Sequence, residues 1–500
     1  MTMNTPVPEE SEIRQQKLEA LKKAGVDPYP SLGTRTATCA QVLDSFDKWQ
    51  KAKKKITLIG RLMTTRVHGG LIFADLKDET GRLQILLKQD EMDEKLFQIF
   101  NDCIDPADFV EVAGILFTTK RGEKTLQVKN WKIVSKALLP LPEKWHGLSD
   151  IEQRFRKRYL DLIMNDDVRE RMEARSKIIS SIRNLMEARG FIEVETPTLQ
   201  PVYGGGFARP FSTHHNALDA DFFLRISDEM YLKRLLVGGF EKVYEITKVF
   251  RNEGVDRDHN PEFTMFEAQI AYEDYKYGMD LFEEIFENAA NTVTGGTKIK
   301  HEDVTVDLKR PWKRMSLVES VQKLGGLKVD LWKDIEQAKK ELGKHIDKSK
   351  KQELDRMNTL GEVLALAFEE LVEEQLIQPT IIFDYPVEVS PLAKRSKDPQ
   401  FAERFEAFAL GSEIGNNYSE LNDPVDLEQR FVEEKKKTEA GFEEAHQVDY
   451  AYLEAIKHGM PPSCGLGIGI DRMVMLLTGA KNIKEVILFP TLRPESRETE

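Results

Sequence analysis

Between residues 56 and 136, apolar and polar positions alternate in short runs. This period of two predicts half-buried β-strands, because successive side chains of a strand point to opposite faces. The runs are 56–61, 71–76, 83–87, 109–114 and 126–128. Asp78-Glu79-Thr80-Gly81 is typical of a hairpin turn, and 88–101 reads as a helix among the strands. Five strands and one helix predict a small OB-fold β-barrel, whose strand face commonly binds single-stranded nucleic acid.

Outside this region the pattern is mainly helical, with strands mixed in. Apolar residues at helical spacing predict a helix over 9–25, and 152–189 reads as one long charged helix that ends at Gly190. Leu139-Pro140-Leu141-Pro142 is a linker, so we expect two domains, 1–142 and 143–500. The second domain carries a charged, mostly helical insertion near 316–376. The whole pattern predicts an α+β protein.

Composition narrows the class of protein. Of 500 residues, 40% are hydrophobic and 31% are charged, as in globular domains with sizeable cores. No apolar run reaches the roughly 20 residues that span a bilayer, and no basic and apolar leader opens the chain. We therefore expect no membrane partner and no signal peptide. Three widely spaced cysteines fit a reducing cytoplasm and exclude a zinc cluster built on C-x-x-C pairs.

The net charge of −13 argues at first against a nucleic-acid partner. A global sum can hide a local field, however. Lysine and arginine recur between residues 48 and 66, in a segment free of Asp and Glu. Such a run is either a solvated face or a surface that contacts phosphates. Its position at the start of the predicted barrel favours the second interpretation.

The stretch from Phe250 to Glu267 gathers the side chains of a nucleotide site. It holds Arg251, His259, Phe263 and several carboxylates. Arginine binds phosphate or carboxylate bidentately, histidine can add a phosphate contact, and a phenylalanine face can stack on a base. No G-x-x-x-x-G-K-[S/T] sequence occurs in the chain, which excludes a P-loop. The stretch therefore predicts an adenine nucleotide bound without a Walker loop.

Three separated blocks resemble the signature motifs of class II aminoacyl-tRNA synthetases. They are residues 191–199, Phe250-Arg251-Asn252-Glu253 and residues 465–472. A glycine-rich block alone is often a packed turn, but three blocks in this order identify the chain as a member of the class. The resemblance implies a catalytic domain built on an antiparallel β-sheet flanked by helices. It also implies a homodimer, because the strand and Pro197 of the first block form the dimer interface in this family.

Within the class, the chain resembles lysyl-tRNA synthetases of the bacterial type from about residue 10 to residue 495. Blocks that carry this resemblance are 208–211, Tyr231-Leu232-Lys233-Arg234-Leu235 and Ser419-Glu420-Leu421-Asn422-Asp423. The implied function is a lysine–tRNA ligase, which activates L-lysine with ATP to lysyl-adenylate and transfers it to the 3′ end of tRNA(Lys).

Three alternatives stay open beside that function. The first is an aspartate or asparagine enzyme of the same subclass, against which Glu420 argues, because the aspartate enzymes need a cation there. The second is a lysyl transferase acting on protein, against which the predicted barrel argues, because such relatives lack it. The third is a non-enzymatic RNA-binding protein, which leaves Arg251 and Arg472 unexplained.

The resemblance assigns the lysine site residue by residue. A buried ammonium needs carboxylate partners, since leaving water unpaired costs several kcal/mol. Glu229 would meet the α-ammonium and Glu420 the ε-ammonium. The implied lysine-binding residues are Gly205, Glu229, Arg251, Glu267, Gln269, Asn416 and Glu420. Gln269 is a departure, because the family usually carries a tyrosine there that helps to hold the ε-ammonium. A glutamine carbonyl can accept the same hydrogen bond but lacks the ring. Cys464 is a second departure, because a smaller residue is common there.

The resemblance likewise implies the ATP site. The catalytic residues would be Arg251, Glu253, His259 and Arg472, and the full ATP-binding set adds Asn260, Phe263, Glu406 and Glu413. Arg251 would bridge the substrate carboxylate and the α-phosphate, and His259 and Arg472 would hold the β- and γ-phosphates. Glu253 would contact the adenine edge, with Phe263 and Arg472 on the two faces of the ring. Glu406 and Glu413 would bind two to three Mg²⁺ ions with ATP, although their seven-residue spacing also fits a solvated helical stripe.

On the barrel, the resemblance assigns anticodon contacts. Phe73 would stack on the central uridine and Gln84 would bind its edge, with Arg66 and Glu123 at the neighbouring positions. The alternative for Phe73 is the barrel core, with Ile72 as the outward residue.

Overall fold

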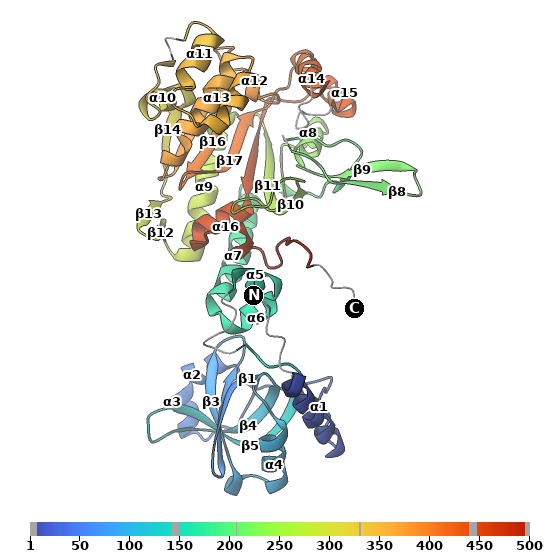
Figure 1. Ribbon diagram of the computed structural model, residues 1–500, viewed down its shortest axis with the longest axis vertical. Coiled ribbons are helices and arrows are strands. Elements are labelled where there is room, and N and C mark those ends of the chain that lie inside the picture. The colour runs from blue at the N-terminus through green and yellow to red at the C-terminus, as the bar shows by residue number, and fades with distance from the viewer. Residues whose placement is uncertain (1–7, 143–149, 207, 330–331, 440–447, 496–500) are drawn as a thin grey trace. The chain divides into compact units, whose positions relative to one another are not determined.

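The computed structural model describes residues 8–142, 150–206, 208–329, 332–439 and 448–495. The chain divides into two compact units, Met1–Ser149 and Asp150–Glu500 (Figure 1). The boundary expected between residues 142 and 143 lies at the edge of a stretch outside the described residues. Within the described part of the chain, no helix is long and apolar enough to cross a membrane.

The first unit is a closed five-stranded barrel. Its strands are β1 (Ile56–His68), β2 (Leu71–Lys77), β3 (Arg82–Lys88), β4 (Phe109–Thr118) and β5 (Lys124–Ser135), in the order β1-β2-β3-β5-β4. Only β3 and β5 pair in parallel. Buried and partly buried residues alternate along β1 and β2, as the sequence pattern predicts. The OB-fold barrel is therefore confirmed.

The described residues of the barrel unit also form four α-helices. They are α1 (Pro8–Lys23), α2 (Cys39–Asp44), α3 (Phe46–Lys51) and α4 (Glu94–Cys103). The helix expected over 88–101 begins later, after a 3₁₀ turn at Gln89–Glu91, because the Asp93 side chain accepts the Leu96 N–H and caps α4 there. In the predicted hairpin turn, the Asp78 carboxylate accepts hydrogen bonds from the backbone of Thr80 and Gly81. Phe97 and Phe100 of α4 are buried in the core of the barrel unit.

The second unit is built on an eight-stranded sheet. Its strands, in spatial order, are β14 (Lys313–Ser316), β15 (Thr380–Pro386), β16 (Phe401–Ala409), β17 (Ser412–Ser419), β18 (Ser463–Gly469), β11 (Glu262–Ala271), β10 (Lys242–Phe250) and β6 (Ile192–Glu193). All neighbours pair antiparallel except the two outermost pairs, β14 with β15 and β10 with β6. The predicted antiparallel sheet flanked by helices is thus confirmed.

Helices α7 (Asp166–Ala188), α9 (Tyr275–Thr294) and α16 (Ile470–Thr478) cover one face of this sheet. They enclose the largest core of the unit, in which Phe282 and Phe286 stack at 4.9 Å between ring centroids. The other face of the central strands is left open for the cavity described below.

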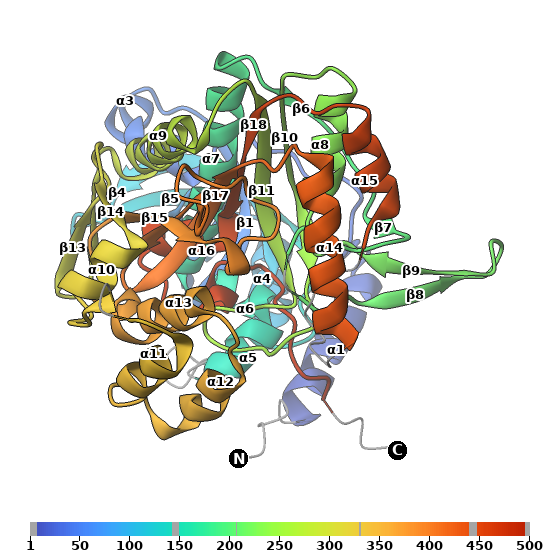
Figure 2. The same ribbon diagram turned by 90° about the horizontal axis from the view of Figure 1, so that it is seen from above.

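Smaller elements surround this sheet. Between β14 and β15 lie α10 (Leu317–Lys323), α11 (Ile335–Leu342), α12 (Lys351–Arg356) and α13 (Leu360–Leu371), which share a separate core. Helices α8 (Glu229–Val237), α14 (Pro424–Glu439) and α15 (Tyr450–Lys457) form another cluster. Strands β12 (Lys298–His301) and β13 (Val304–Asp307) pair alone. Strands β7 (Leu199–Gln200), β8 (Ser212–His215) and β9 (Ala220–Leu224) form a small sheet, and the β8–β9 hairpin extends away from its unit (Figure 2).

The segment 152–189 is helical, as predicted, but it is not one continuous helix. The segment forms three helices, α5 (Ile151–Arg156), α6 (Arg158–Met164) and α7, with breaks at Lys157 and Asn165. The break places the buried Arg158 guanidinium against Asp161 at 2.8 Å and against the backbone carbonyls of Lys484, Ile487 and Leu488. A buried cation needs such partners, and here the chain's C-terminal segment provides them. Gly190 follows α7 with φ +79°, as expected for a helix end.

Candidate active site

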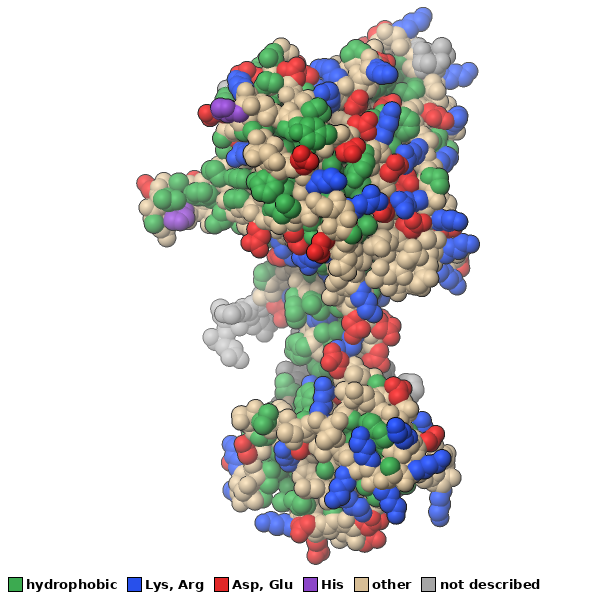
Figure 3. All heavy atoms as spheres, turned by 180° about the vertical axis from the view of Figure 1, so that it is seen from behind, with side chains coloured by type: hydrophobic (Ala, Val, Ile, Leu, Met, Phe, Trp, Pro, Cys, Tyr) green, Lys and Arg blue, Asp and Glu red, His purple; other side chains and the backbone are tan. Residues whose placement is uncertain are grey.

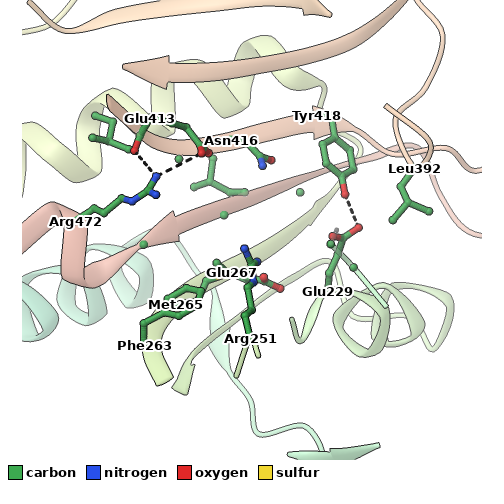
Figure 4. A pocket seen from close by; sticks show the side chains of 18 of the residues that line it. Glu229, Arg251, Phe263, Met265, Glu267, Leu392, Glu413, Asn416, Tyr418 and Arg472 are labelled. Carbon is green, nitrogen blue, oxygen red and sulfur yellow. Dashed lines mark hydrogen bonds and ion pairs between the residues drawn. The ribbon is translucent and has the colours of Figure 1, made fainter. Parts of the chain in front are cut away.

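A cavity of about 320 Å³ lies on the open face of the eight-stranded sheet (Figure 4). It is lined by strands β11, β17 and β18, by the segment 251–260, by the start of α8 and by residues 390–393, among others. The predicted ATP and lysine residues that line it are Gly205, Glu229, Arg251, Glu253, His259, Asn260, Phe263, Glu267, Gln269, Glu413, Asn416, Glu420 and Arg472. The structure thus gathers the predicted set from four distant parts of the chain. Glu406 is not among the lining residues.

The strand period explains why these positions meet. Every second residue of β11 from Phe263 to Gln269 lines the cavity, whereas Phe266 and Ala268 between them are buried in the core. Glu413 of strand β17, on the other side of β18 in the same sheet, faces the same cavity. The sheet therefore carries polar side chains on one face and the hydrophobic core on the other.

One end of the cavity carries Arg472, which the sequence predicts to bind phosphates (Figure 4). Arg472, in the first turn of α16, donates to the Glu413 carbonyl at 2.8 Å and lies 3.1 Å from His259 Nε2. The other ring nitrogen of His259 lies 2.9 Å from Asp256, which fixes the ring. Asp471 beside Arg472 is buried and accepts from the Thr264 backbone and from Arg175, which anchors the start of α16 on β11. A guanidinium and an imidazole are both groups that can bind phosphate oxygens, as the sequence predicts for Arg472 and His259.

Arg251 stands between the two ends of the cavity, at the end of β10. Its backbone N–H donates to Pro261, and its guanidinium lies 5.2 Å from the centre of the Phe263 ring. Of the three guanidinium nitrogens, only Nε makes a hydrogen bond within the described part of the chain, to the Ile226 carbonyl at 3.4 Å. Burial lowers the pKa of Arg251, and the nearby carboxylates of Glu253 and Glu267 oppose that shift. The two terminal nitrogens therefore remain available to an anionic substrate.

Glu406 and Glu413 lie on adjacent antiparallel strands, β16 and β17, and not on a helical stripe. Glu406 accepts hydrogen bonds from Tyr385 and Arg404, at 2.8 and 2.5 Å. Burial and then the charge of Glu413 raise the pKa of Glu406, and Arg404 opposes this. Each carboxylate has about four lone-pair sites, so these contacts leave acceptors for a cation. The pair therefore fits Mg²⁺, which takes few carboxylates and completes its shell with phosphates and water.

The opposite end of the cavity holds buried carboxylates. Glu420, which follows β17, and Glu267 are 1% and 7% exposed, and Glu229 opens α8. Gln269 Nε2 donates to Glu420 at 2.7 Å, and Ser227 Oγ donates to Glu267 at 2.9 Å. This end is therefore suited to a cationic group that enters from the cavity.

Gly205 has no room for a side chain. Its φ of +85° is left-handed, and an added Cβ would lie 2.7 Å from Ser227 Oγ. The glycine thus lets the backbone approach Ser227 and Glu229 closely. Asn416 lines the cavity on β17, opposite Glu406 in the register of the two strands.

Sequence reasoning missed several residues of this site. Tyr418 donates to Glu229, and the Lys233 ammonium contacts both Glu229 and Glu420. Asp228 is fully buried, and among the described residues no group donates a hydrogen bond to its carboxylate oxygens; burial and then Glu267 raise its pKa well above the usual range. The position of Lys233 four residues after Glu229 indicates an ion pair on a helix, but such pairs are typical of an exposed helix face. Tyr418 gave no separate signal.

The predicted anticodon residues meet on the barrel. Ile72 is buried in the core, whereas Phe73 is half-buried, so Phe73 is the more exposed residue of the pair. Arg66 is opposite Phe73 in the β1–β2 register, and Gln84 of β3 is opposite Asp75 of β2.

Glu123 lies at the start of the fifth barrel strand. It is exposed and immediately precedes β5, whose Thr125 donates to Gln84 at 2.8 Å. All four predicted anticodon residues therefore lie on or beside neighbouring strands. On the face seen in Figure 3, Lys and Arg side chains gather on the barrel unit.

Residues 150–493 match the family described as tRNA synthetases class II (D, K and N), where the letters stand for aspartate, lysine and asparagine. Residues 56–134, which span the barrel, match the OB-fold nucleic acid binding domain. The two matches fall within the two compact units.

Curated relatives align with nearly the whole chain. A lysine–tRNA ligase of Thermoanaerobacter sp. (strain X514) is 48% identical over 97% of this chain and 96% of its own length. Another from Roseiflexus sp. (strain RS-1) is 48% identical over 97% of this chain and 99% of its own length. One from Pelotomaculum thermopropionicum is 47% identical, with 96% and 94% covered. These matches, with which the barrel and the antiparallel sheet agree, show that the chain belongs to the class II tRNA synthetases of the aspartate, lysine and asparagine group.

Proposed function

We propose that the chain is a lysine–tRNA ligase, with residues 143–500 as its catalytic domain and residues 1–142 as its anticodon-binding domain. The choice of lysine as the substrate rests on one observation, the carboxylate end of the cavity, where Glu229 and Glu420 line the wall. An aspartate side chain would be repelled there, and an asparagine amide would leave a buried charge unpaired.

ATP–pyrophosphate exchange over a panel of amino acids tests this proposal, followed by charging of tRNA(Lys). We expect exchange with lysine only. Exchange that depends on aspartate or asparagine would overturn the assignment. Exchange with lysine but no charging of tRNA(Lys) would favour a lysyl transferase that acts on protein.

In the first step, an oxygen of the lysine carboxylate attacks the α-phosphorus of ATP, and the bond to pyrophosphate breaks. In the second, a hydroxyl of the terminal adenosine attacks the lysyl carbonyl and AMP leaves. The lysine carboxylate is already ionised, so the first step needs no general base. The work of the protein is to align the reactants and to stabilise charge on the phosphates.

The side chains divide this work by their position in the cavity. Arg251, between the two ends, bridges the lysine carboxylate and the α-phosphate. His259 and Arg472, 3.1 Å apart, hold the outer phosphates. Phe263 stacks on the adenine with Arg472 on its other face, and Glu253 and Asn260 contact the nucleotide edge.

Members of this class use Mg²⁺ with ATP, and the carboxylates of Glu413 and Glu406 would hold it here. We assign two to three ions to the complex with ATP. The ions, when bound, neutralise charge on the phosphate oxygens. Glu413 lies beside Arg472, so its carboxylate is close to the expected position of the outer phosphates.

Gln269 supplies an acceptor for the lysine ε-ammonium. A carboxylate only accepts hydrogen bonds, so the contact with Glu420 must use the amide nitrogen of Gln269. The amide oxygen is buried and has no hydrogen-bond partner within the described residues. A buried acceptor without a partner costs about 1–3 kcal/mol, which a bound ammonium would recover.

Gln269→Leu is expected to raise the KM for lysine by about 5- to 100-fold, because the ammonium loses this acceptor. The KM for ATP should change little. Both are measured by ATP–pyrophosphate exchange. Gln400→Leu, an exposed glutamine outside the cavity, is the matched control. An unchanged KM for lysine would show that Gln269 takes no part in recognition.

The barrel binds the anticodon on the surface formed by Arg66, Phe73, Gln84 and Glu123. Phe73→Ala is expected to raise the apparent KM for tRNA(Lys) by about 5- to 150-fold, because stacking contributes about 1–3 kcal/mol per base. Phe73→Leu keeps the apolar cover but removes the flat ring, so it should show much of the same defect. Lysine-dependent pyrophosphate exchange should stay normal in both variants. A large loss of thermal stability with unchanged tRNA kinetics would assign Phe73 to barrel packing.

We propose a homodimer, in which the edge of the sheet and the β8–β9 hairpin contact a second copy. Ile192 of the edge strand β6 is 52% exposed, and every residue of β8 is exposed. The buried, unpaired thiols of Cys39, Cys103 and Cys464 fit a reducing compartment, so we place the protein in the cytoplasm.

A further inference from the structure

The lysine at position 233 is the most deeply buried ammonium of the catalytic unit described here. It lies on α8, one turn after Glu229, and its side chain is 1% exposed. Its Nζ contacts Glu229 and lies 2.5 Å from Glu420 Oε2. The rings of Tyr418 and Tyr452 lie 5.2 and 6.0 Å from the same ammonium. One cation is thus shared between two carboxylates from distant parts of the chain.

Lys233 lies behind the cavity wall and not in it. Glu229, Glu420 and Tyr418 line the cavity, whereas Lys233 is not among the lining residues. A bound amino acid would therefore touch the two carboxylates but not the ammonium behind them. Any effect of Lys233 on the substrate has to pass through Glu229 and Glu420.

We propose that Lys233 is a positioning residue for amino-acid recognition. Its ammonium pairs with Glu229 and Glu420 and holds both carboxylates in place to receive the two ammonium groups of the substrate. This inference rests on the proposed lysine specificity and adds to it a residue that the substrate never contacts.

The charge balance supports this role. Glu229, Glu420 and Lys233 together carry one net negative charge when all are ionised. A cationic substrate side chain compensates this negative charge, whereas an uncharged side chain would leave it buried without a counter-charge. Without Lys233 the two carboxylates would carry two charges in a buried site, and one of them would take up a proton instead.

The groups around Glu420 leave Lys233 as its main positive neighbour. Glu420 faces Glu229 and Lys233 from α8, Gln269 from β11, Tyr418 from β17, Tyr452 from α15 and Cys464 from β18. Burial raises the pKa of Glu420 to about 7, and the charge of Lys233 opposes the rise. Removal of that cation would therefore raise the pKa of Glu420 further.

Lys233→Met tests the proposal, because methionine keeps much of the volume and removes the charge. The value of kcat/KM for lysine is measured from pH 5.5 to 9 by pyrophosphate exchange. We expect its acid limb to move up by about one pH unit or more, which lowers kcat/KM about tenfold at a fixed pH below the limb. The KM for ATP should stay near that of the unaltered protein. Lys323→Met, which removes an exposed lysine paired four residues apart with Glu319, is the matched control.

An unshifted acid limb and an unchanged KM for lysine in a folded Lys233→Met protein would overturn the proposal. If Lys233→Met does not fold, Lys233→Met/Glu229→Gln decides the question by thermal unfolding. A folded double variant supports the counter-ion role, because it removes one charge of each sign. Failure of both to fold would assign Lys233 to packing and overturn the proposal. The unaltered protein is tested first, and its failure to activate lysine would refute the proposed function instead.

Discussion

Glu413→Gln is expected to reduce lysyl-adenylate formation by at least about 10²- to 10³-fold. The carboxylate lies beside Arg472, with 3.5 Å between Glu413 Oε2 and Nη1, at the phosphate end of the cavity. Loss of one preorganised group that stabilises developing charge commonly costs this much in rate. The amide keeps the size of the side chain but binds Mg²⁺ more weakly than a carboxylate. Lysine-dependent ATP–pyrophosphate exchange measures the effect.

The fold should survive this change. The Glu413 backbone carbonyl, which accepts the hydrogen bond from Arg472, is untouched. We therefore expect a thermal unfolding midpoint close to that of the unaltered protein. Glu403→Gln alters a carboxylate on the neighbouring strand outside the cavity lining and serves as the control. Near-normal exchange in Glu413→Gln would refute the role of this carboxylate in binding ATP and Mg²⁺.

The barrel could be predicted because each of its strands is indicated by a pattern of neighbouring residues. In each run, the period of two assigns core and surface together, so Ile72 and Phe73 take opposite faces once the strand is recognised. The broken helix over 152–189 was not predictable in this way. Its break depends on Arg158, whose guanidinium binds carbonyls more than 320 residues later in the sequence, and no local pattern encodes that contact.

The cavity, too, depends on contacts between distant parts of the chain that no local pattern encodes. The motif residues around Arg251 and Arg472 were identified by resemblance, and the structure brings them into one cavity. Lys233 lies in the block 231–235, but its place in the site could not be predicted. Glu229 and Lys233 are four residues apart, which is the spacing of an ordinary surface ion pair on a helix. Glu420, which is 187 residues later in the sequence, contacts Lys233 in the fold, and this contact turns the pair into a buried triad. A sequence without its fold cannot show which ion pair loses contact with water.

Glu420→Gln is expected to lower kcat/KM for lysine by about 10²- to 5 × 10³-fold. Glu420 is 1% exposed, so the substrate ε-ammonium would lose its charged partner in a site with little water. Removal of one member of a buried ion pair costs about 3–5 kcal/mol, and each 1.36 kcal/mol is a factor of ten. Lys233 also loses one of its two carboxylates, but Glu229 still pairs with it. Pyrophosphate exchange at varied lysine and at varied ATP separates this defect from a nucleotide defect.

The pH dependence gives the same variant a second test. Burial raises the pKa of Glu420 to about 7, so the carboxyl group is neutral at lower pH and cannot pair with an ammonium. In the unaltered protein, kcat/KM for lysine should therefore fall as the pH drops through about 7, because this ratio reports the ionisation of the free enzyme. Glu420→Gln should lack this acid limb, and Glu454→Gln, on the exposed side of α15, should keep it. If the limb persists in Glu420→Gln, another group controls lysine binding, and the ε-ammonium contact must be reassigned.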